Sequence, residues 1–230
     1  MSQSMLRVLH SSDLHGACEA LLAMQEDFEV WLDTGDFFPN LGRVEATGFR
    51  IDPVEERQHQ LHWFAEAELA GRLHDWLQGR KALSVPGNHD FVPLAALLRQ
   101  SGVDADEITS DGVRALGLTW AGFREVPWMQ GEWEGEARDL DALVDAAFAV
   151  DPDILATHAP PAGILDHPGL FGIPELATAL TERKHNIKAH FFGHEHDDGG
   201  KWLHVGETLC VNAATAIMIV TVSTPERVMP

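Results

Sequence analysis

The chain has 230 residues, of which 45% are hydrophobic and 23% are charged. A chain of this length can fill one α/β domain around one large core, and no apolar run approaches the roughly 18 residues that a membrane helix requires. Its 36 acidic and 16 basic residues give a formal charge of −20. Because this charge repels a phosphate backbone, we do not expect a long nucleic acid as a partner, and the lack of a long apolar run leads us to expect no membrane partner.

Cysteine usage and the N-terminus bear on the cellular compartment. Cys18 and Cys210 are too few for a disulfide framework, and residues 1–10 lack the apolar segment of a signal peptide. We therefore expect reduced thiols packed in the core, Cys18 included, and a cytoplasmic protein. No linker, repeat or low-complexity tract divides the chain, so a single domain is predicted over residues 1–230.

The first half of the chain alternates predicted strands with predicted helices. The strands are short apolar runs that stop at polar turns, and Pro53 occupies a position typical of a first helical turn. Strands are predicted at residues 5–10, 28–32 and 82–85, and helices at 17–25, 54–78 and 93–100. This order indicates βαβ units.

The second half continues the pattern and ends in strands alone. A hairpin turning near Gly117 is predicted at 113–123, helices at 140–149 and 174–184, strands at 154–157 and 189–192, and short antiparallel strands at 202–205, 208–211 and 216–222. The whole is typical of an α/β protein.

Five predicted strands carry Asp, Asn or His at their carboxyl ends. That edge is where ligand sites lie in open α/β sheets. The candidate ligands are Asp13, His15, Asp36, Asn88, His158, His194 and His196. Asp13 and His15 are separated by one residue, as are His194 and His196. In an extended chain, the two side chains of each pair therefore project to the same side. The remaining lone histidines, such as His10 and His190, are expected to be hydrogen-bonded rather than ligands.

The candidate ligands point to two metal ions. Oxygen and imidazole donors without thiolate suit manganese, iron, zinc or nickel, as divalent or mixed-valence ions. Seven ligands exceed the roughly three of one open catalytic metal, but they suffice for two if a carboxylate bridges, and Asp36 is the candidate bridge. Two cations about 3.5 to 4 Å apart lower the pKa of a shared water toward roughly 7 and clamp a phosphoryl group. A metal-bound hydroxide is therefore the expected nucleophile.

His89, next to the candidate ligand Asn88, is placed to protonate a leaving alkoxide. Such an acid contributes on the order of a hundred- to ten-thousandfold in rate. Asp90 is expected to accept a hydrogen bond from the His89 ring and to keep that ring charged and oriented. His89 and Asp90 are thus predicted as catalytic residues and not as metal ligands.

Together these residues resemble the calcineurin-like metallophosphoesterase family. The matching motifs, in the family's order, are Asp13-Leu14-His15, Gly35-Asp36, Gly87-Asn88-His89-Asp90, Thr157-His158 and Gly193-His194-Glu195-His196. The resemblance implies a four-layer α/β/β/α sandwich of two mixed β-sheets flanked by helices. It also implies two ligand sets that share Asp36: Asp13, His15, Asp36 and His196 for one metal, and Asp36, Asn88, His158 and His194 for the other.

Departures from the family patterns narrow the branch. Protein serine/threonine phosphatases and their dinucleoside-polyphosphate-cleaving relatives carry Arg soon after Gly-Asp and Glu after Asn-His. Here residues 37–40 are Phe-Phe-Pro-Asn, and His89 is followed by Asp90. The motifs, and the segment 157–166, are instead similar to the small cyclic-nucleotide and general phosphodiesterase branch.

The expected function is hydrolysis of phosphodiesters, cyclic nucleotides among them, or of small phosphomonoesters. The partner would be a small phosphorylated substrate such as a nucleotide, and the sequence indicates no oligomeric state. Two other classes stay open: a non-catalytic metal-binding interaction module on the same scaffold, although no ligand is missing, and a DNA-end nuclease, although 16 Lys and Arg form a basic groove with difficulty.

Several loop residues are candidates for substrate contact. Phe37, Phe38, and the pair Leu170 and Phe171 could stack on an aromatic group or pack the loops, and His167 and Arg124 could contact phosphate or lie exposed. The loop that contains Trp128 and Trp133 is explained as well by a subunit contact as by loop anchoring.

Overall fold

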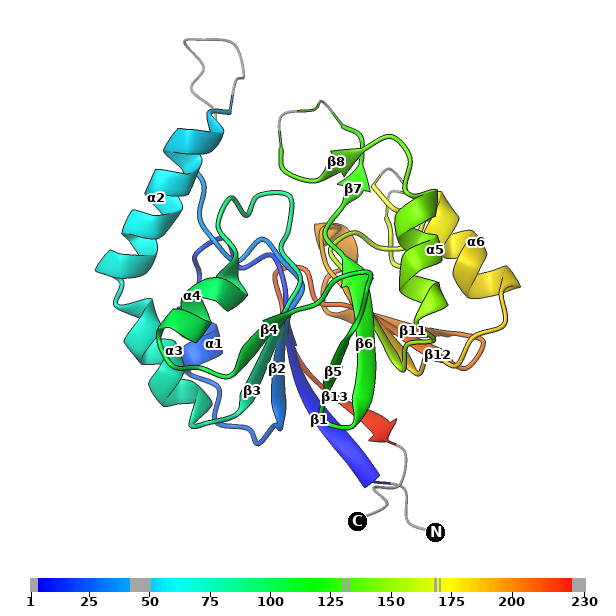
Figure 1. Ribbon diagram of the computed structural model, residues 1–230, viewed down its shortest axis with the longest axis horizontal. Helices are drawn as coiled ribbons and strands as arrows, with labels where there is room; N and C mark the ends of the chain where they lie inside the picture. The colour runs from blue at the N-terminus through cyan, green and yellow to red at the C-terminus, as the bar shows by residue number, and fades with distance from the viewer. Residues whose placement is uncertain are drawn as a thin grey trace.

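The computed structural model describes residues 4–41, 51–129, 131, 133–167, 169 and 171–224. Two β-sheets face each other, and helices cover the outer face of each (Figure 1). This is the four-layer α/β/β/α sandwich of mixed sheets that the family resemblance implied.

The first sheet has the order β13-β1-β2-β3-β4. Its strands are β1 (Ser4–Ser11), β2 (Val30–Asp33), β3 (Lys81–Ser84), β4 (Ala105–Glu107) and β13 (Ile217–Thr224). Strands β1 to β4 are parallel, and β13 is antiparallel to β1. The sequence did not predict β4, because two of its three residues are acidic and show no apolar pattern.

The second sheet has the order β11-β12-β10-β9-β6-β5. Its strands are β5 (Val113–Ala115), β6 (Leu118–Phe123), β9 (Ile154–Thr157), β10 (Ala189–Phe192), β11 (Lys201–Val205) and β12 (Thr208–Asn212). The sequence predicted three short antiparallel strands at the C-terminal end. β11 and β12 are antiparallel to each other, but β12 is also parallel to β10, and β13 belongs to the first sheet. A small pair, β7 (Val126–Pro127) and β8 (Glu136–Ala137), lies outside both sheets.

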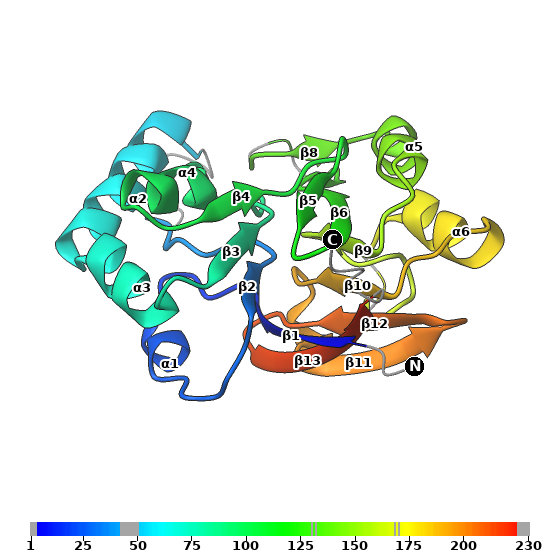
Figure 2. The ribbon, with the colours of Figure 1, turned by 60° about the horizontal axis from the view of Figure 1, so that its bottom comes forward.

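The helices divide between the two outer faces (Figure 2). Those beside the first sheet are α1 (Glu19–Leu22), α2 (Pro53–Glu66), α3 (Leu69–Leu77) and α4 (Leu94–Gln100). Those beside the second sheet are α5 (Asp141–Ala149) and α6 (Pro174–Glu182). One apolar cluster lies between the helices and the sheet on each outer side, and another, which includes Trp120 and Phe191, fills the space between the sheets.

The single helix predicted over residues 54–78 is in fact two helices, α2 and α3. Glu68 adopts a left-handed conformation with φ of 51° and ends the first helical run. The break reorients the chain so that Leu69, Leu73 and Leu77, spaced four apart, are all buried against the first sheet. Helix propensity alone carries no sign of this break. Helix α1, at four residues, is also shorter than predicted.

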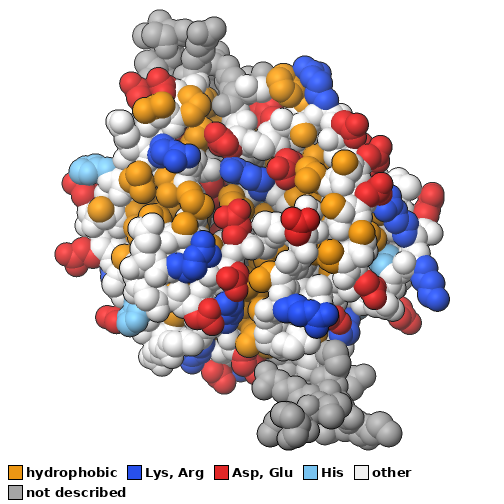
Figure 3. Space-filling model, viewed as in Figure 1, with side chains coloured by type: hydrophobic (Ala, Val, Ile, Leu, Met, Phe, Trp, Pro, Cys, Tyr) orange, Lys and Arg blue, Asp and Glu red, His pale blue; other side chains and the backbone are white. Residues whose placement is uncertain are grey.

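Charged side chains of both signs are interspersed with apolar ones on the face shown in Figure 3. Within the described residues, no helix has the length and apolar character needed to span a bilayer. Cys18 and Cys210 are both buried and free. Burial raises the pKa of both thiols to about 12, which suits core packing rather than reactivity.

Two fully buried histidines lie outside the predicted ligand set. The ring of His10 shares a 2.9 Å hydrogen bond with Thr34 Oγ1, and that of His190 shares one of 2.8 Å with Thr157 Oγ1. Burial lowers the pKa of each ring from 6.5 to about 3. Both are hydrogen-bonded, as the sequence predicted, and both are neutral at ordinary pH.

These histidines should make folding stability depend on acid pH. Between pH 6.5 and about 3 the unfolded chain binds a proton at each position while the folded chain does not, so stability is complete above pH 6.5 and decreases below it. The slope is roughly 1.4 kcal/mol per pH unit for each histidine. His190→Gln, whose amide can still donate to Thr157, should reduce the slope measured by denaturant unfolding by that amount. His74→Gln, the control at an exposed histidine, should leave the slope unchanged. Equal slopes for His190→Gln and the unsubstituted protein would contradict the lowered pKa of His190.

Candidate metal centre

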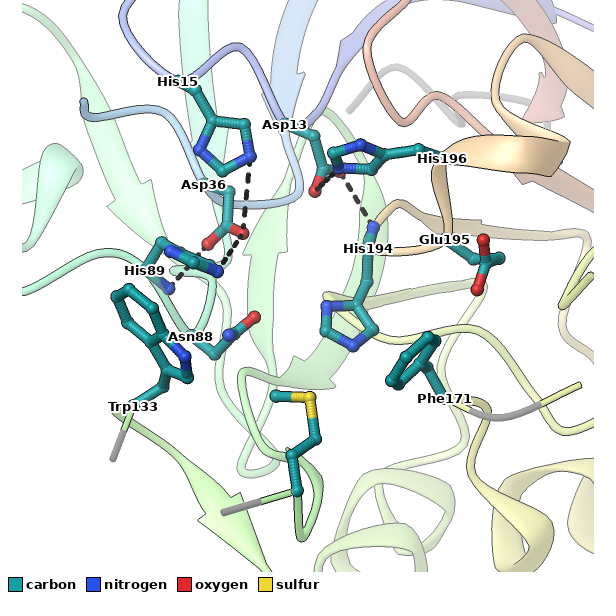
Figure 4. Close-up of a pocket in the computed structure, with 11 residues that line it drawn as sticks. Asp13, His15, Asp36, Asn88, His89, Trp133, Phe171, His194, Glu195 and His196 are labelled. Atoms are coloured by element: carbon teal, nitrogen blue, oxygen red, sulfur yellow. Dashed lines mark hydrogen bonds and ion pairs between the residues drawn. The ribbon is translucent and has the colours of Figure 1, made fainter. Parts of the chain in front are cut away.

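The five strand ends that carry the predicted ligands meet at one end of the molecule. Strands β1, β2 and β3 of the first sheet are parallel to one another, as are β9 and β10 of the second, and their carboxyl ends open toward the same cavity. Figure 4 shows side chains from these loops turned toward one another. All seven predicted ligands lie in this cluster.

Backbone hydrogen bonds hold the loops after β1 and β2 together. Asp13 N donates to Gly35 O at 2.8 Å, and His15 N donates to Asp36 O at 2.9 Å. Asp13, His15, Asp36 and His194 all have positive φ, between 44° and 66°. This conformation is uncommon for residues other than glycine and is maintained here by the surrounding bonds, as is frequent at functional sites.

Asp13 is buried and accepts hydrogen bonds on both carboxylate oxygens. Oδ2 accepts from Ser12 Oγ at 2.6 Å and from His194 N at 2.8 Å, while Oδ1 lies 3.2 Å from His196 Nε2. Burial opposes ionisation, but the hydrogen bond with His196 and the charge of His158 lower the pKa of Asp13 below its usual value. Asp13 is therefore a carboxylate with an oxygen directed at His196.

Asp36 occupies the centre of the cluster. Its Oδ1 accepts from His89 N at 2.8 Å. Its Oδ2 lies 3.4 Å from His158 Nε2, 3.9 Å from His15 Nε2 and 4.0 Å from His89 Nε2. Burial opposes the charge of Asp36, yet the neighbouring histidines lower the pKa of its carboxyl. One carboxylate oxygen thus faces imidazoles from three loops.

His158 is oriented by the end of β2. Its Nδ1 lies 2.7 Å from Thr34 O, which can only accept, so Nδ1 carries a proton and Nε2 faces the cluster. Nε2 lies 3.0 Å from Asn88 Oδ1 and 3.2 Å from His194 Nδ1. Burial by itself would lower the pKa of His158, but the Asp36 carboxylate raises it to about 9.

The cluster has the donor chemistry that a metal pair requires. Three overlapping groups have potential ligand atoms within 4.8 Å of one another: Asp13, His15 and His196; His15, Asp36 and His89; and Asp36, His158 and His194. His194 Nε2 is buried without a hydrogen-bond partner, which is costly for an imidazole nitrogen unless a ligand satisfies it. The residues therefore fit metal ions held by oxygen and imidazole nitrogen.

The expected hydrogen bond between Asp90 and the His89 ring is not formed. The Asp90 carboxylate instead accepts three backbone N–H groups, from Asp36 and Gly87 at 2.8 Å and from Phe38 at 3.2 Å. These donors are close because the loops after β2 and β3 meet there. Burial raises the pKa of Asp90 to about 6. The Asp90 carboxylate therefore holds the backbone of Asp36 in place.

The His89 ring has other partners. Its Nδ1 lies 3.0 Å from Asn40 Oδ1, and its centroid lies 3.8 Å from that of Trp133 with a tilt of 40° between the rings. Burial lowers the pKa of His89, while the Asp36 charge opposes that shift. Asn40 therefore takes the place that the sequence interpretation gave to Asp90.

The ligands line a cavity of about 500 Å³. Its lining residues are Asp13, His15, Asp36, Asn88, His89, Met129, Trp133, Phe171, His194, Glu195 and His196. The sequence interpretation did not place Met129, Trp133 or Glu195 here. The only signal for Trp133 was its membership of a Trp-rich loop, and Glu195 stands between two candidate ligands.

Most of the candidate substrate contacts lie elsewhere. Phe37 and Phe38 are fully buried among aromatic side chains of the core. Arg124 Nη2 donates to Gly87 O and Asp90 O, both at 2.8 Å, and so supports the loop after β3. His167 is 72% exposed beside Asp197. Leu170 lies outside the described residues, whereas Phe171 does line the cavity.

Comparisons with known proteins agree with this geometry. The family model described as calcineurin-like phosphoesterase matches residues 6–198. The UPF0046 protein K07C11.7 of Caenorhabditis elegans is 29% identical over 217 residues, which cover 91% of this chain and 69% of that protein. The phosphopantetheinyl hydrolase PptH from Mycobacterium tuberculosis has a similar fold, with a TM-score of 0.50 and 15% identity over 91% of this chain and 89% of that one.

Two glycines allow the loops to approach this closely. A Cβ at Gly87 would overlap the Asp36 carboxylate, and one at Gly193 would overlap Ser12 Oγ and Asp13 Oδ2. Any larger residue at either position would displace a predicted ligand.

Gly193→Ala should therefore destabilise the protein by about 1 to 3 kcal/mol, the usual range for overpacking. The matched control is Gly71→Ala in α3, where an added Cβ would meet nothing within 4 Å, and which should stabilise by roughly 0.5 to 1 kcal/mol through helix propensity. Denaturant unfolding measures both. Equal effects of the two substitutions would contradict the close approach at Gly193.

Proposed function

Since the chain belongs to the calcineurin-like phosphoesterase family, we propose that it is a metal-dependent phosphoesterase that hydrolyses phosphodiesters or small phosphomonoesters. The observation that carries the proposal is the convergence of seven Asp, Asn and His side chains in one cluster beside the cavity. The buried free thiols suit a reducing compartment, so the proposed location is the cytoplasm.

Two ligand sets that share Asp36 are proposed. Asp13, His15, Asp36 and His196 would hold one ion, and Asp36, Asn88, His158 and His194 would hold the other. The shared role of Asp36 is supported by the position of Oδ2, which lies 3.9 Å from His15 Nε2 of the first set and 3.4 Å from His158 Nε2 of the second. When bound, the ions, of manganese, iron, zinc or nickel, would polarise the phosphoryl group and supply a nucleophile from water at neutral pH.

His89 is the proposed general acid. Its Nδ1 is engaged by Asn40, whereas its Nε2 lies on the side of Asp36 Oδ2, at 4.0 Å. Nε2–H is therefore the proton that can be donated to the leaving-group oxygen as the P–O bond breaks, and solvent restores it afterwards. Trp133 packs against one face of the ring.

The cavity suits a small ester with an apolar organic group. Its volume of about 500 Å³ falls in the usual range for small-molecule sites. Met129, Trp133 and Phe171 give it an apolar wall beside the ligand cluster. Cyclic nucleotides are one class of phosphodiester with a flat apolar group of this kind.

The activity and the role of His89 can be tested together. The manganese-loaded protein should hydrolyse an aryl phosphodiester or monoester, and His89→Asn should keep its metal content. Because an alkoxide needs a proton more than an aryl oxide does, His89→Asn should lower kcat roughly 100-fold or more on alkyl esters and much less on nitrophenyl esters. Failure of the fully loaded protein to hydrolyse any ester in the panel would refute the function, and equal losses on both ester types would refute the acid.

Asp36→Asn tests the shared ligand. Loss of the charge and of the central oxygen should reduce bound metal from about two ions per chain, the expected dinuclear content, to less than one. Elemental analysis after gel filtration measures this, and His59→Asn, in α2, is a control away from the cluster. Retention of both ions by Asp36→Asn would contradict the bridging assignment.

A further inference from the structure

We infer that Asn40, held by Glu56 of helix α2, is a positioning residue that keeps a proton on Nδ1 of His89 and so reserves Nε2 for exchange with substrate. The inference rests on the proposed acid role of His89. Asn40 and Glu56 are not among the seven proposed ligands, and Glu56 is in none of the acidic and histidine groups found among the described residues.

The orientation of the Asn40 amide follows from its hydrogen bonds. Its Nδ2 donates to His89 O at 3.1 Å and to Glu56 Oε2 at 3.3 Å. Oε2 also accepts from Leu41 N at 3.2 Å, and a backbone N–H can only donate. Both protons of the amide nitrogen are thus directed at acceptors, and Oδ1 must be the atom that faces His89.

The protonated nitrogen of the His89 ring is then fixed. Asn40 Oδ1 lies 3.0 Å from Nδ1 and has no proton to give, so Nδ1 must donate. A neutral ring carries its single proton on Nδ1, and a charged ring carries a second on Nε2. The contact with Asn40 therefore leaves Nε2 as the ring nitrogen on the side of Asp36 Oδ2.

Helix α2 supports this arrangement with two buried polar side chains one turn apart. Glu56 is 3% exposed and Gln60 is 0% exposed. Gln60 Nε2 donates to His89 O at 2.7 Å, and Gln60 Oε1 accepts from Phe91 N at 2.9 Å. Burying a carboxyl group and an amide on one helix is costly unless both are hydrogen-bonded. Here Glu56 accepts from Asn40 and Leu41 N, and Gln60 bonds His89 O and Phe91 N.

The ring is held from a second direction as well. Trp133 packs on its face at 3.8 Å between centroids. With Asn40 at Nδ1 and Trp133 on the face, Nε2 points to the cavity side, toward Asp36 Oδ2. Figure 4 shows this ring between Trp133 and Asp36.

Nitrogen NMR of protein labelled with 15N in its histidines tests the tautomer directly. In the zinc-loaded, diamagnetic protein, with the His89 signals assigned by their loss in His89→Asn, the neutral ring should be protonated at Nδ1. Asn40→Ala should shift it toward the Nε2–H form. A wild-type ring protonated at Nε2, or a Nδ1–H population that Asn40→Ala leaves unchanged, would overturn the inference.

Kinetics provide the second readout. With metal content and thermal unfolding compared in parallel, Asn40→Ala should lower kcat on alkyl esters roughly 10- to 100-fold, as loss of an orienting partner does elsewhere, with little change on nitrophenyl esters or in KM. Asn40→Ala combined with His89→Asn should be no slower than His89→Asn alone. The control Asn186→Ala removes an exposed asparagine bonded to Asp151 and should match wild type.

A swapped pair guards against a purely structural explanation. In Asn40→Asp with Glu56→Gln, the carboxylate at position 40 accepts from His89 Nδ1 and the amide at position 56 donates to it, so alkyl-ester turnover should recover at least tenfold relative to Asn40→Ala. No recovery in a folded, metal-loaded swap variant would overturn the inference. If His89→Asn slows alkyl esters but Asn40→Ala does not, only this inference fails, whereas an unimpaired His89→Asn would remove the acid role and the inference together.

Discussion

The position of Asp36 is the constraint on which the rest of the site depends. Its side chain reaches the centre of the cluster because the loop after β2 and the loop after β3 are in contact. Gly87 leaves no Cβ between them, and the Asp90 carboxylate accepts the N–H groups of Asp36, Phe38 and Gly87. Arg124 also donates to the carbonyl groups of Gly87 and Asp90 and so holds the loop after β3. Backbone bonds thus set the geometry of the side chains.

The same arrangement concentrates charge in a place where it is costly. Asp13 and Asp36 are both buried carboxylates, and the charge of Asp36 opposes the ionisation of Asp13 by raising its pKa. Neighbouring imidazoles nevertheless lower the pKa of both carboxyl groups, and His194 Nε2 is left without a hydrogen-bond partner. A cluster of this kind gains free energy from cations more than from any further hydrogen bond among its own groups. In our account, metal binding and chemistry therefore depend on the same strained, charge-rich loops.

The strand ends and the seven clustered side chains could be predicted from sequence because each depends on local pattern. In a chain that alternates strands and helices, an apolar run followed by Asp, Asn or His is typical of a strand whose carboxyl end faces a ligand site. The partner of His89 could not be predicted in this way. Asn40 and His89 are 49 residues apart, and the choice between Asn40 and Asp90 depends on which backbone N–H groups meet when two loops pack. Trp133 reaches the cavity for a similar reason, through a loop whose path no periodicity encodes. The break at Glu68 adjusts α3 to the sheet and likewise follows from tertiary packing.

The central claim is that two metal ions share Asp36. Anomalous scattering from crystals grown with manganese tests it most directly. The account predicts two peaks about 3.5 to 4 Å apart, with an oxygen of Asp36 between them and with Asn88 and His158 at one peak and His15 and His196 at the other. A single fully occupied peak, or two peaks that Asp36 does not join, would contradict it.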